Sequence, residues 1–272
     1  MTSTQSGAPV ALGSRVLVVH FEEIDSTSMH ARREIAANRL GDAPAAFVAA
    51  CQTAGVGRFG RSWSSPEGGL WMTLAWPCVE TELAARLDGL GLRVGMACLR
   101  VVQSVCAGSI ADRHVRLKWP NDVLVHGRKA LGVLTEIVRG PEPSCRPWIV
   151  VGVGINANIE LGQLPEPARS HATSLKGELG RPVELGALEQ DVLRELAAAL
   201  SVSGLSPELI REAAANLHGR GRDTLVSLPD GTRVSGVLTG LNDHGMAVLN
   251  IDGRVFVPPL GSVIMTDHPE KA

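Results

Sequence analysis

The spacing of hydrophobic residues in this chain predicts strands mixed with helices from residue 15 to residue 200. Apolar runs of strand length occupy residues 15–21, 45–50, 70–76, 130–138 and 148–153. Apolar residues recur at helical spacing in residues 89–106 and 188–200. Asp25-Ser26-Thr27 supplies capping side chains for a further helix, which we expect to run to Leu40 and stop at Gly41. This mixture predicts an α+β fold.

A different pattern occupies the C-terminal part of the chain. Short strand-like runs at residues 224–228, 233–238, 246–251 and 254–257 are separated by turn sequences such as Pro229-Asp230-Gly231. Ser206-Pro207 starts a short helix before them, which Gly219 and Gly221 are suited to end. We therefore expect a flexible leader at residues 1–14, a large domain at residues 15–220 and a small β-barrel domain at residues 221–272.

The composition removes several classes of protein. The net charge is −2 with acids and bases nearly balanced, so no global field favours nucleic acid. The five cysteines lack a CxxC spacing, which argues against a disulfide framework and a structural zinc site. The chain shows neither a signal-peptide pattern nor an apolar run long enough to cross a bilayer. We expect a cytoplasmic protein.

Residues 115–136 bring two lysines and a carboxylate into one short hairpin. Pro120 favours an extended residue before it, so the chain is expected to turn at Asn121-Asp122, directly after Lys118. Lys129 opens the next apolar run. This arrangement predicts a site for an anionic ligand. The alternative is a surface hairpin with a solvated Lys118–Asp122 pair.

A glycine-spaced loop with arginines follows the strand at residues 45–50. It reads Gln52-Thr53-Ala54-Gly55-Val56-Gly57-Arg58-Phe59-Gly60-Arg61-Ser62-Trp63. Glycine lets backbone N–H groups approach a phosphate closely, and Arg58 and Arg61 can each bind one through paired hydrogen bonds. This pattern is typical of a loop that folds around an anion.

The run Gly152-Val153-Gly154-Ile155-Asn156-Ala157 matches the dinucleotide-binding fingerprint G-x-G-x-x-A but lacks its context. That fingerprint requires a helix next, whereas residues 158–168 contain Pro165 and Pro167 and show no helical period. We interpret the run as a turn that lets a substrate approach the backbone.

Taken in order, these motifs resemble those of the biotin protein ligases. The matching runs are Asp25-Ser26-Thr27-Ser28, the glycine–arginine loop, Lys118-Trp119-Pro120-Asn121-Asp122, Arg128-Lys129-Ala130-Leu131-Gly132 and Gly152-Val153-Gly154-Ile155-Asn156. The resemblance covers residues 16–200, and the tail resembles the family's SH3-like domain. It implies a mixed-sheet catalytic domain of the class II synthetase and biotin–lipoate ligase type. Residues 1–14 are too few for a helix-turn-helix, so the expected form lacks an N-terminal DNA-binding domain.

The resemblance implies a two-step reaction with biotin and ATP as substrates and Mg²⁺ as a cofactor. The biotin carboxylate attacks the α-phosphate of ATP, which gives biotinyl-5'-AMP and pyrophosphate. A lysine amine of the biotin carboxyl carrier domain of a carboxylase then attacks the acyl carbon and releases AMP. The implied enzyme is a monomer or homodimer that binds neither DNA nor membrane.

The same resemblance assigns residues to this chemistry. Lys129 and Arg58 are the expected catalytic residues, and a solvated lysine at a strand end is the alternative for Lys129. The expected biotin-binding residues are Ser26, Thr27, Ser28, Gln52, Gly55, Val56, Gly57, Arg58, Lys129, Gly132 and Gly152. The expected nucleotide-binding residues are Arg61, Trp63, Lys118, Asn121, Asp122 and Asn156, with Asp122 also a metal ligand. Residues 55–63 are expected to form a lid that ligand orders.

Two residues depart from the family's pattern, which usually has arginine where Val56 stands and asparagine where Ser28 stands. An enzyme that activates biotin but transfers it poorly is therefore one alternative. A lipoate or octanoate ligase or transferase is another, because those enzymes resemble this fold and keep a lysine near the acyl carbon. A third alternative is a non-catalytic biotin sensor. The Trp119-Pro120-Asn121-Asp122 run favours biotin.

Overall fold

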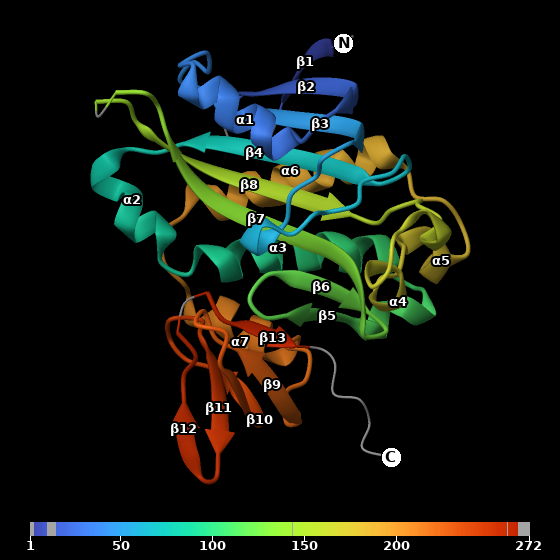
Figure 1. The fold of residues 1–272 in the computed structure, drawn as a ribbon, viewed down its shortest axis with the longest axis vertical. Helices are drawn as coiled ribbons and strands as arrows, with labels where there is room; N and C mark the ends of the chain where they lie inside the picture. The colour runs from blue at the N-terminus through green and yellow to red at the C-terminus, as the bar shows by residue number, and fades with distance from the viewer. Residues whose placement is uncertain (1–2, 10–14, 143, 260, 266–272) are drawn as a thin grey trace.

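The computed structural model describes residues 3–9, 15–142, 144–259 and 261–265. Within them, the large domain is built on an eight-stranded sheet in the order β1-β2-β3-β4-β8-β7-β6-β5 (Figure 1). Its strands are β1 (Ser3–Pro9), β2 (Arg15–Ile24), β3 (Ala45–Gln52), β4 (Leu70–Pro77), β5 (Val115–Lys118), β6 (Asp122–Val125), β7 (Arg128–Arg139) and β8 (Pro147–Ile155). Among the described strands of this sheet, β2 and β3 are the one parallel pair, and the other pairs are antiparallel. The expected α+β class with a mixed sheet is confirmed.

Helices cover both faces of this sheet. The long helices α3 (Leu90–Cys106) and α6 (Leu185–Ser201) lie on one face, and α1 (Thr27–Ala36) lies on the other (Figure 1). The shorter elements are α2 (Glu80–Leu87), α4 (Ala168–His171), α5 (Leu175–Leu179), α7 (Pro207–Ala215) and the 3₁₀ turns η1 (Arg58–Gly60), η2 (Ile110–His114) and η3 (Leu161–Gln163).

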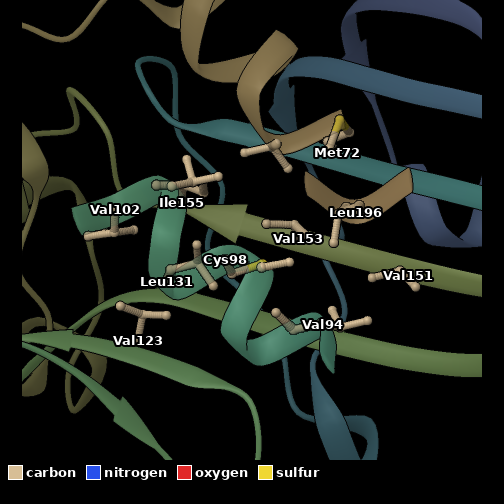
Figure 2. Close-up of a cluster of buried hydrophobic side chains, with 14 of the residues drawn as sticks. Met72, Val94, Cys98, Val102, Val123, Leu131, Val151, Val153, Ile155 and Leu196 are labelled. Carbon is tan, nitrogen blue, oxygen red and sulfur yellow. The ribbon is translucent and has the colours of Figure 1, made fainter. Parts of the chain in front are cut away.

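The main core lies between the sheet and the pair α3 and α6. Val94, Cys98 and Val102 are spaced four apart on α3, so they lie along the side of the helix that faces the sheet. Figure 2 shows them close to side chains of the strands and of α6, among them Met72, Val123, Leu131, Val151, Val153, Ile155 and Leu196. Burial among these apolar groups raises the pKa of the Cys98 thiol to about 12.

The opposite face of the sheet is only partly covered by α1. Ala31 and Ile35 of this helix pack on a second cluster that contains Phe47 of β3 and Trp148 and Val150 of β8. Further along β8 the same face carries glycine instead of large side chains, at Gly152 and Gly154. The uncovered part of this face holds the candidate site.

The C-terminal part forms a second, antiparallel sheet in the order β12-β11-β10-β9-β13. Its strands are β9 (Asp223–Ser227), β10 (Arg233–Leu241), β11 (Ala247–Ile251), β12 (Arg254–Phe256) and β13 (Val263–Met265). Trp119 of the lysine hairpin is buried against this part, and its Nε1 donates to the Gly245 carbonyl oxygen at 2.9 Å. The expected small β domain is confirmed, and an indole from the large domain anchors it.

The structure corrects several expected boundaries. Of the expected flexible leader at residues 1–14, residues 3–9 form β1 and pair with β2, while residues 1–2 and 10–14 lie outside the described residues. The first helix ends at Ala36 instead of Leu40, because Asn38 takes a left-handed conformation (φ 52°) that ends helical pairing well before Gly41. The helix after Ser206 ends at Ala215, before Gly219. Helix α2 and strand β13 were not expected.

Among the described residues, none of the single helices has the length and apolar character needed to span a bilayer. Helices α2 and α3 reach that length and apolar character only together, and they meet at a bend of 64°.

One buried cation joins the helices behind the sheet. Arg93 of α3 is 4% exposed, and its guanidinium donates to the carbonyl oxygens of Arg86, Asp88, Ala199 and Gly204 at the ends of α2 and α6. Burial lowers the pKa of this guanidinium, which nevertheless stays charged. The side chain therefore satisfies carbonyl groups that the ends of two helices leave without helical partners.

We predict that Arg93→Met lowers the free energy of unfolding by at least about 2 kcal/mol, because several buried carbonyl oxygens lose their donors. Urea denaturation followed by circular dichroism measures the change. The matched control is Arg100→Met on the same helix, where a largely exposed pair with Glu212 is lost and the cost should stay below about 1 kcal/mol. Equal losses in the two variants would contradict this role for Arg93.

Candidate active site

A cavity of about 450 Å³ opens on the glycine-bearing face of the large sheet. Its walls come from the start of α1, the loop at residues 52–64, strands β5 to β8 and the segment at residues 164–172. Strand β13 of the C-terminal sheet contributes Val263 and Ile264. Segments far apart in the sequence therefore enclose one space.

Glycine forms the floor of this cavity. Gly132 of β7 lies opposite Gly154 of β8, and Gly152 lies opposite Thr73 of β4. A Cβ at Gly154 would come within 2.5 Å of Trp63 Nε1, and one at Gly132 within 2.9 Å of the same ring. The indole of Trp63 therefore packs directly on backbone that has no side chain. Its Nε1 is buried and has no hydrogen-bond partner among the described residues.

The cavity wall is strongly cationic. Among the described residues that line it, the cations are Arg58, Arg61, Lys118, Arg128 and Lys129, and the single carboxylate is Asp122. Lys129 Nζ lies 2.8 Å from Asp122 Oδ2, and it also lies 4.9 Å from the centre of the Trp63 ring. The two charged groups are less than one third exposed, so the pair is held in one place beside the aromatic wall.

Hydrogen bonds within its own backbone hold the glycine–arginine loop together. Gly57 N donates to Arg61 O at 2.7 Å and Trp63 N donates to Gly55 O at 2.8 Å, which makes residues 55–63 a narrow hairpin. Burial lowers the pKa of the Arg58 guanidinium, with Asp122 opposing the shift and Arg61 adding to it. Arginine keeps its charge under such a shift, so the cost of desolvating Arg58 remains for an anion to offset.

A second wall of the cavity carries hydroxyl and amide groups. Ser26 caps α1, accepting from Met29 N at 3.4 Å, and Ser28 follows in the first turn. Gln52 at the end of β3 accepts from Thr27 N at 2.8 Å and donates to Ser65 at 2.7 Å. Ser26 and Ser28 are almost fully buried, yet both line the cavity together with Gln52. These residues therefore offer neutral polar contacts in a cavity whose other lining groups include five cations.

The structure brings most of the expected site residues together. Those that line the cavity are Ser26, Ser28, Gln52, Val56, Gly57, Arg58, Arg61, Trp63, Lys118, Asp122, Lys129, Gly132, Gly152 and Asn156. Three do not line it: Thr27 turns its hydroxyl to Gln52 and Thr73, Gly55 lies against the Trp63 carbonyl, and the Asn121 amide donates to Val133 O at 2.7 Å. Asn156 lines the cavity, but its amide donates to backbone oxygens of Lys129 and Thr173.

Comparisons with known proteins show which family this chain belongs to. The Biotin/lipoate A/B protein ligase family matches residues 22–156. The biotin–[acetyl-CoA-carboxylase] ligase of Mycobacterium tuberculosis is 31% identical over 220 residues, which are 80% of this chain and 77% of that protein. The chain belongs to the biotin protein ligase family.

Solved structures of biotin protein ligases have the same fold. The Aquifex aeolicus enzyme in complex with biotin and ATP superposes with a TM-score of 0.76 at 24% identity, covering 91% of this chain and 98% of that one. The Leishmania major enzyme in complex with biotinyl-5-AMP gives 0.57 at 25% identity, covering 89% and 98%.

Several residues that line or support the cavity were not expected. Thr73 is a polar residue inside the apolar run at residues 70–76, and that mismatch was the available signal. Arg128 stands beside Lys129 in the sequence, and its position next to that lysine and its charge were the available signals. Val263 and Ile264 come from a three-residue strand, and their sequence carries no mark of a role in the cavity.

The described residues contain no group of three or more histidine, cysteine, aspartate or glutamate side chains able to hold a metal ion alone. Asp122 is paired with Lys129, so the carboxylate that faces the cavity is already partly neutralised. Magnesium is usually held by one or two carboxylates together with phosphate oxygens and water. This donor set fits a magnesium ion that arrives with a nucleotide.

We predict that Gly154→Ala lowers the free energy of unfolding by about 1–3 kcal/mol, because the new methyl group forces the rigid Trp63 ring off the floor. Thermal unfolding measures the loss, and Trp63 should become more accessible to a fluorescence quencher. Gly162→Ala is the control, since a Cβ there meets nothing within 4 Å. If Gly154→Ala matches this control in both measurements, Trp63 does not rest on Gly154.

Proposed function

We propose that this protein joins biotin to ATP and then transfers the biotinyl group to a lysine of a biotin carboxyl carrier protein. The observation that carries the proposal is the grouping of Arg58, Lys118 and Lys129 around one cavity whose other wall is neutral and polar. The cations suit phosphate and carboxylate, and the polar wall suits an uncharged ring with hydrogen-bonding groups. The relatives named above carry out ligations of this kind.

The cationic wall addresses the main barrier of the first step. A carboxylate must approach a triphosphate, and two unit charges about 4 Å apart repel by roughly 4 kcal/mol at a partly shielded site. Lys129 and Arg58 line the same cavity, so both cations would offset this repulsion where the carboxylate meets the phosphate. The new bond joins the carboxylate oxygen to the α-phosphorus, and the bond to the pyrophosphate oxygen breaks.

Lys129 is the best placed group for both steps. Its ammonium group would contact the biotin carboxylate and the oxygen that bridges to the adenylate. In the second step a carrier amine attacks the acyl carbon and AMP leaves with the bridging oxygen. A cation beside that oxygen stabilises its growing negative charge. Trp63 and residues 55–63 would keep water away from the intermediate.

The polar wall favours biotin over lipoate. The ring of lipoate is a disulfide that neither donates nor accepts a strong hydrogen bond, so it could not use the further hydrogen bonds that Ser26, Ser28 and Gln52 offer to the cavity. The cyclic urea of biotin carries two N–H donors and one carbonyl acceptor. The hydrogen-bonding groups of this part of the cavity therefore support a biotin ligase.

A magnesium ion would be held by the nucleotide phosphates together with Asp122, and it would supply charge neutralisation at the phosphates. We further propose that the enzyme acts in the cytoplasm, as a monomer or homodimer, without binding DNA or membrane. The five cysteines are free, which agrees with a reducing compartment.

We predict that Lys129→Ala lowers the rate of carrier biotinylation by about 10² or more, because a preorganised charge at the reacting oxygen is lost. Transfer of labelled biotin to a carrier domain, with ATP and Mg²⁺, measures the rate. The matched control is Lys176→Ala, which removes an exposed lysine paired with Glu160 outside the cavity and should label the carrier normally. Equal labelling by wild type and Lys129→Ala would remove this residue from the mechanism.

We predict that Val56→Arg changes the rate of biotinyl-AMP loss by less than about tenfold, equivalent to about 1.4 kcal/mol. Arg58 and Arg61 already line the cavity beside Val56, so they should retain the adenylate without a third arginine. Hydrolysis of isolated enzyme-bound biotinyl-AMP, without carrier, measures the loss. A wild type that releases the intermediate freely, with a variant that holds it, would show that Val56 has weakened retention.

A further inference from the structure

Hydrogen bonds connect the end of β3 to β4 through the first turn of α1. Thr27 Oγ1 lies 3.1 Å from Gln52 Oε1 and 2.8 Å from Thr73 Oγ1, and Thr73 Oγ1 lies 3.0 Å from Ser28 Oγ. Thr27, Ser28 and Thr73 are 3%, 6% and 0% exposed. Thr27 and Thr73 do not line the cavity, so solvent supplies no alternative partners for their hydroxyl groups, and their protons must be placed within this chain of groups.

The direction of the first bond follows from a backbone amide. Thr27 N–H can only donate, and it points at the side chain of Gln52 from 2.8 Å, so the atom it meets is the amide oxygen. The Gln52 nitrogen lies on the other side and donates to Ser65 Oγ at 2.7 Å. A carbonyl oxygen only accepts, and therefore the Thr27 hydroxyl must donate to Gln52.

The remaining directions follow because a hydroxyl has one proton. The Thr27 hydroxyl donates its one proton to Gln52. In its contact with Thr73, where the two Oγ1 atoms lie 2.8 Å apart, it must therefore accept. The Thr73 hydroxyl donates its one proton to Thr27. It must therefore accept from Ser28, whose Oγ lies 3.0 Å from Thr73 Oγ1. The reverse direction would leave the oxygens of Thr27 and Gln52 facing each other at 3.1 Å with no proton between them.

We infer that Ser28 presents only its lone pairs to the cavity, and that Thr73, which does not line the cavity, is the positioning residue that enforces this. The ligand atom beside Ser28 and Gly152 must accordingly carry a proton. On the proposed function, on which this inference rests, that atom is one of the two ring N–H groups of biotin. Thr73 thus makes this part of the slot specific for a hydrogen-bond donor.

The test compares biotin with two cyclic carbamates, in each of which one ring N–H is replaced by oxygen. Isothermal titration calorimetry gives the affinity of each compound for wild type and Thr73→Val. Wild type should bind one of the carbamates at least about tenfold more weakly than the other, because oxygen then faces the Ser28 lone pairs. In Thr73→Val the Ser28 hydroxyl loses its acceptor and can donate to the ring oxygen instead. The ratio of the two carbamate affinities should therefore fall about tenfold.

The controls separate this effect from a loss of packing. Thr73→Ser keeps the hydroxyl and should keep the wild-type ratio. Thr135→Val removes another buried hydroxyl, one without a partner among the described residues, and should also leave the ratio unchanged. Ser28→Ala removes the acceptor itself, so it should abolish the discrimination and does not depend on Thr73→Val folding. Because each ratio compares two ligands on one protein, a general weakening of the slot cancels.

The outcomes are distinguishable. A reduced ratio in Thr73→Val and Ser28→Ala, with Thr73→Ser unchanged, supports the inference. A wild-type ratio in either Ser28→Ala or folded Thr73→Val overturns the inference while leaving the ligase function intact. If wild type binds no biotin in the calorimeter, the proposed function fails and the inference fails with it.

Discussion

One patch of the large sheet carries no side chains, and the cavity exists because of it. Gly132, Gly152 and Gly154 lie together where β7, β8 and β4 pair, and at each position a methyl group would collide with Trp63, Lys129 or Ser28. On the same face, the neighbouring stretch of β8 carries Trp148 and Val150 and is filled by α1. Side-chain volume thus divides a single sheet face into a packed half and an open half.

The open half gathers several cations around a single lining carboxylate. Asp122 neutralises Lys129, while Arg58 is desolvated beside it. Holding cations in a partly buried wall costs folding free energy, and that cost falls when an anion arrives. Cations held in this way reduce the stability of the fold but can stabilise negative charge that develops during a reaction. The wall that carries Ser26, Ser28 and Gln52 is neutral, and buried partners direct its hydroxyl protons.

The parts of the site that could be predicted are those whose chemistry is local. Lys118 and Asp122 pair across a two-strand hairpin, and Pro120 and Asn121 between them predict its turn. The glycine–arginine loop is recognisable from the spacing of its residues alone. Strands of the core were predictable because their apolar runs have strand length. The first helix is shorter than the sequence predicts because Asn38 adopts a left-handed conformation. No glycine or proline at that point in the sequence indicates the end of the helix.

The parts that could not be predicted depend on long-range pairing. Thr73 acquires its partners only when β4 passes under the start of α1, and β1 forms only because β2 offers an edge. Trp119 packs in a core with residues of the second sheet, and no local pattern in the sequence indicates this contact. Nothing near residue 263 indicates that it reaches the cavity, because its three-residue strand is positioned by β9.

That position of β13 has a practical consequence for anyone who handles the protein. The last described strand forms part of the cavity wall, while β1 lies at the opposite edge of the large sheet from the lysine hairpin. A purification tag or reporter fused directly after β13 therefore starts at the cavity wall. A fusion placed at the amino end starts from the far side, so it is the better choice for labelling experiments.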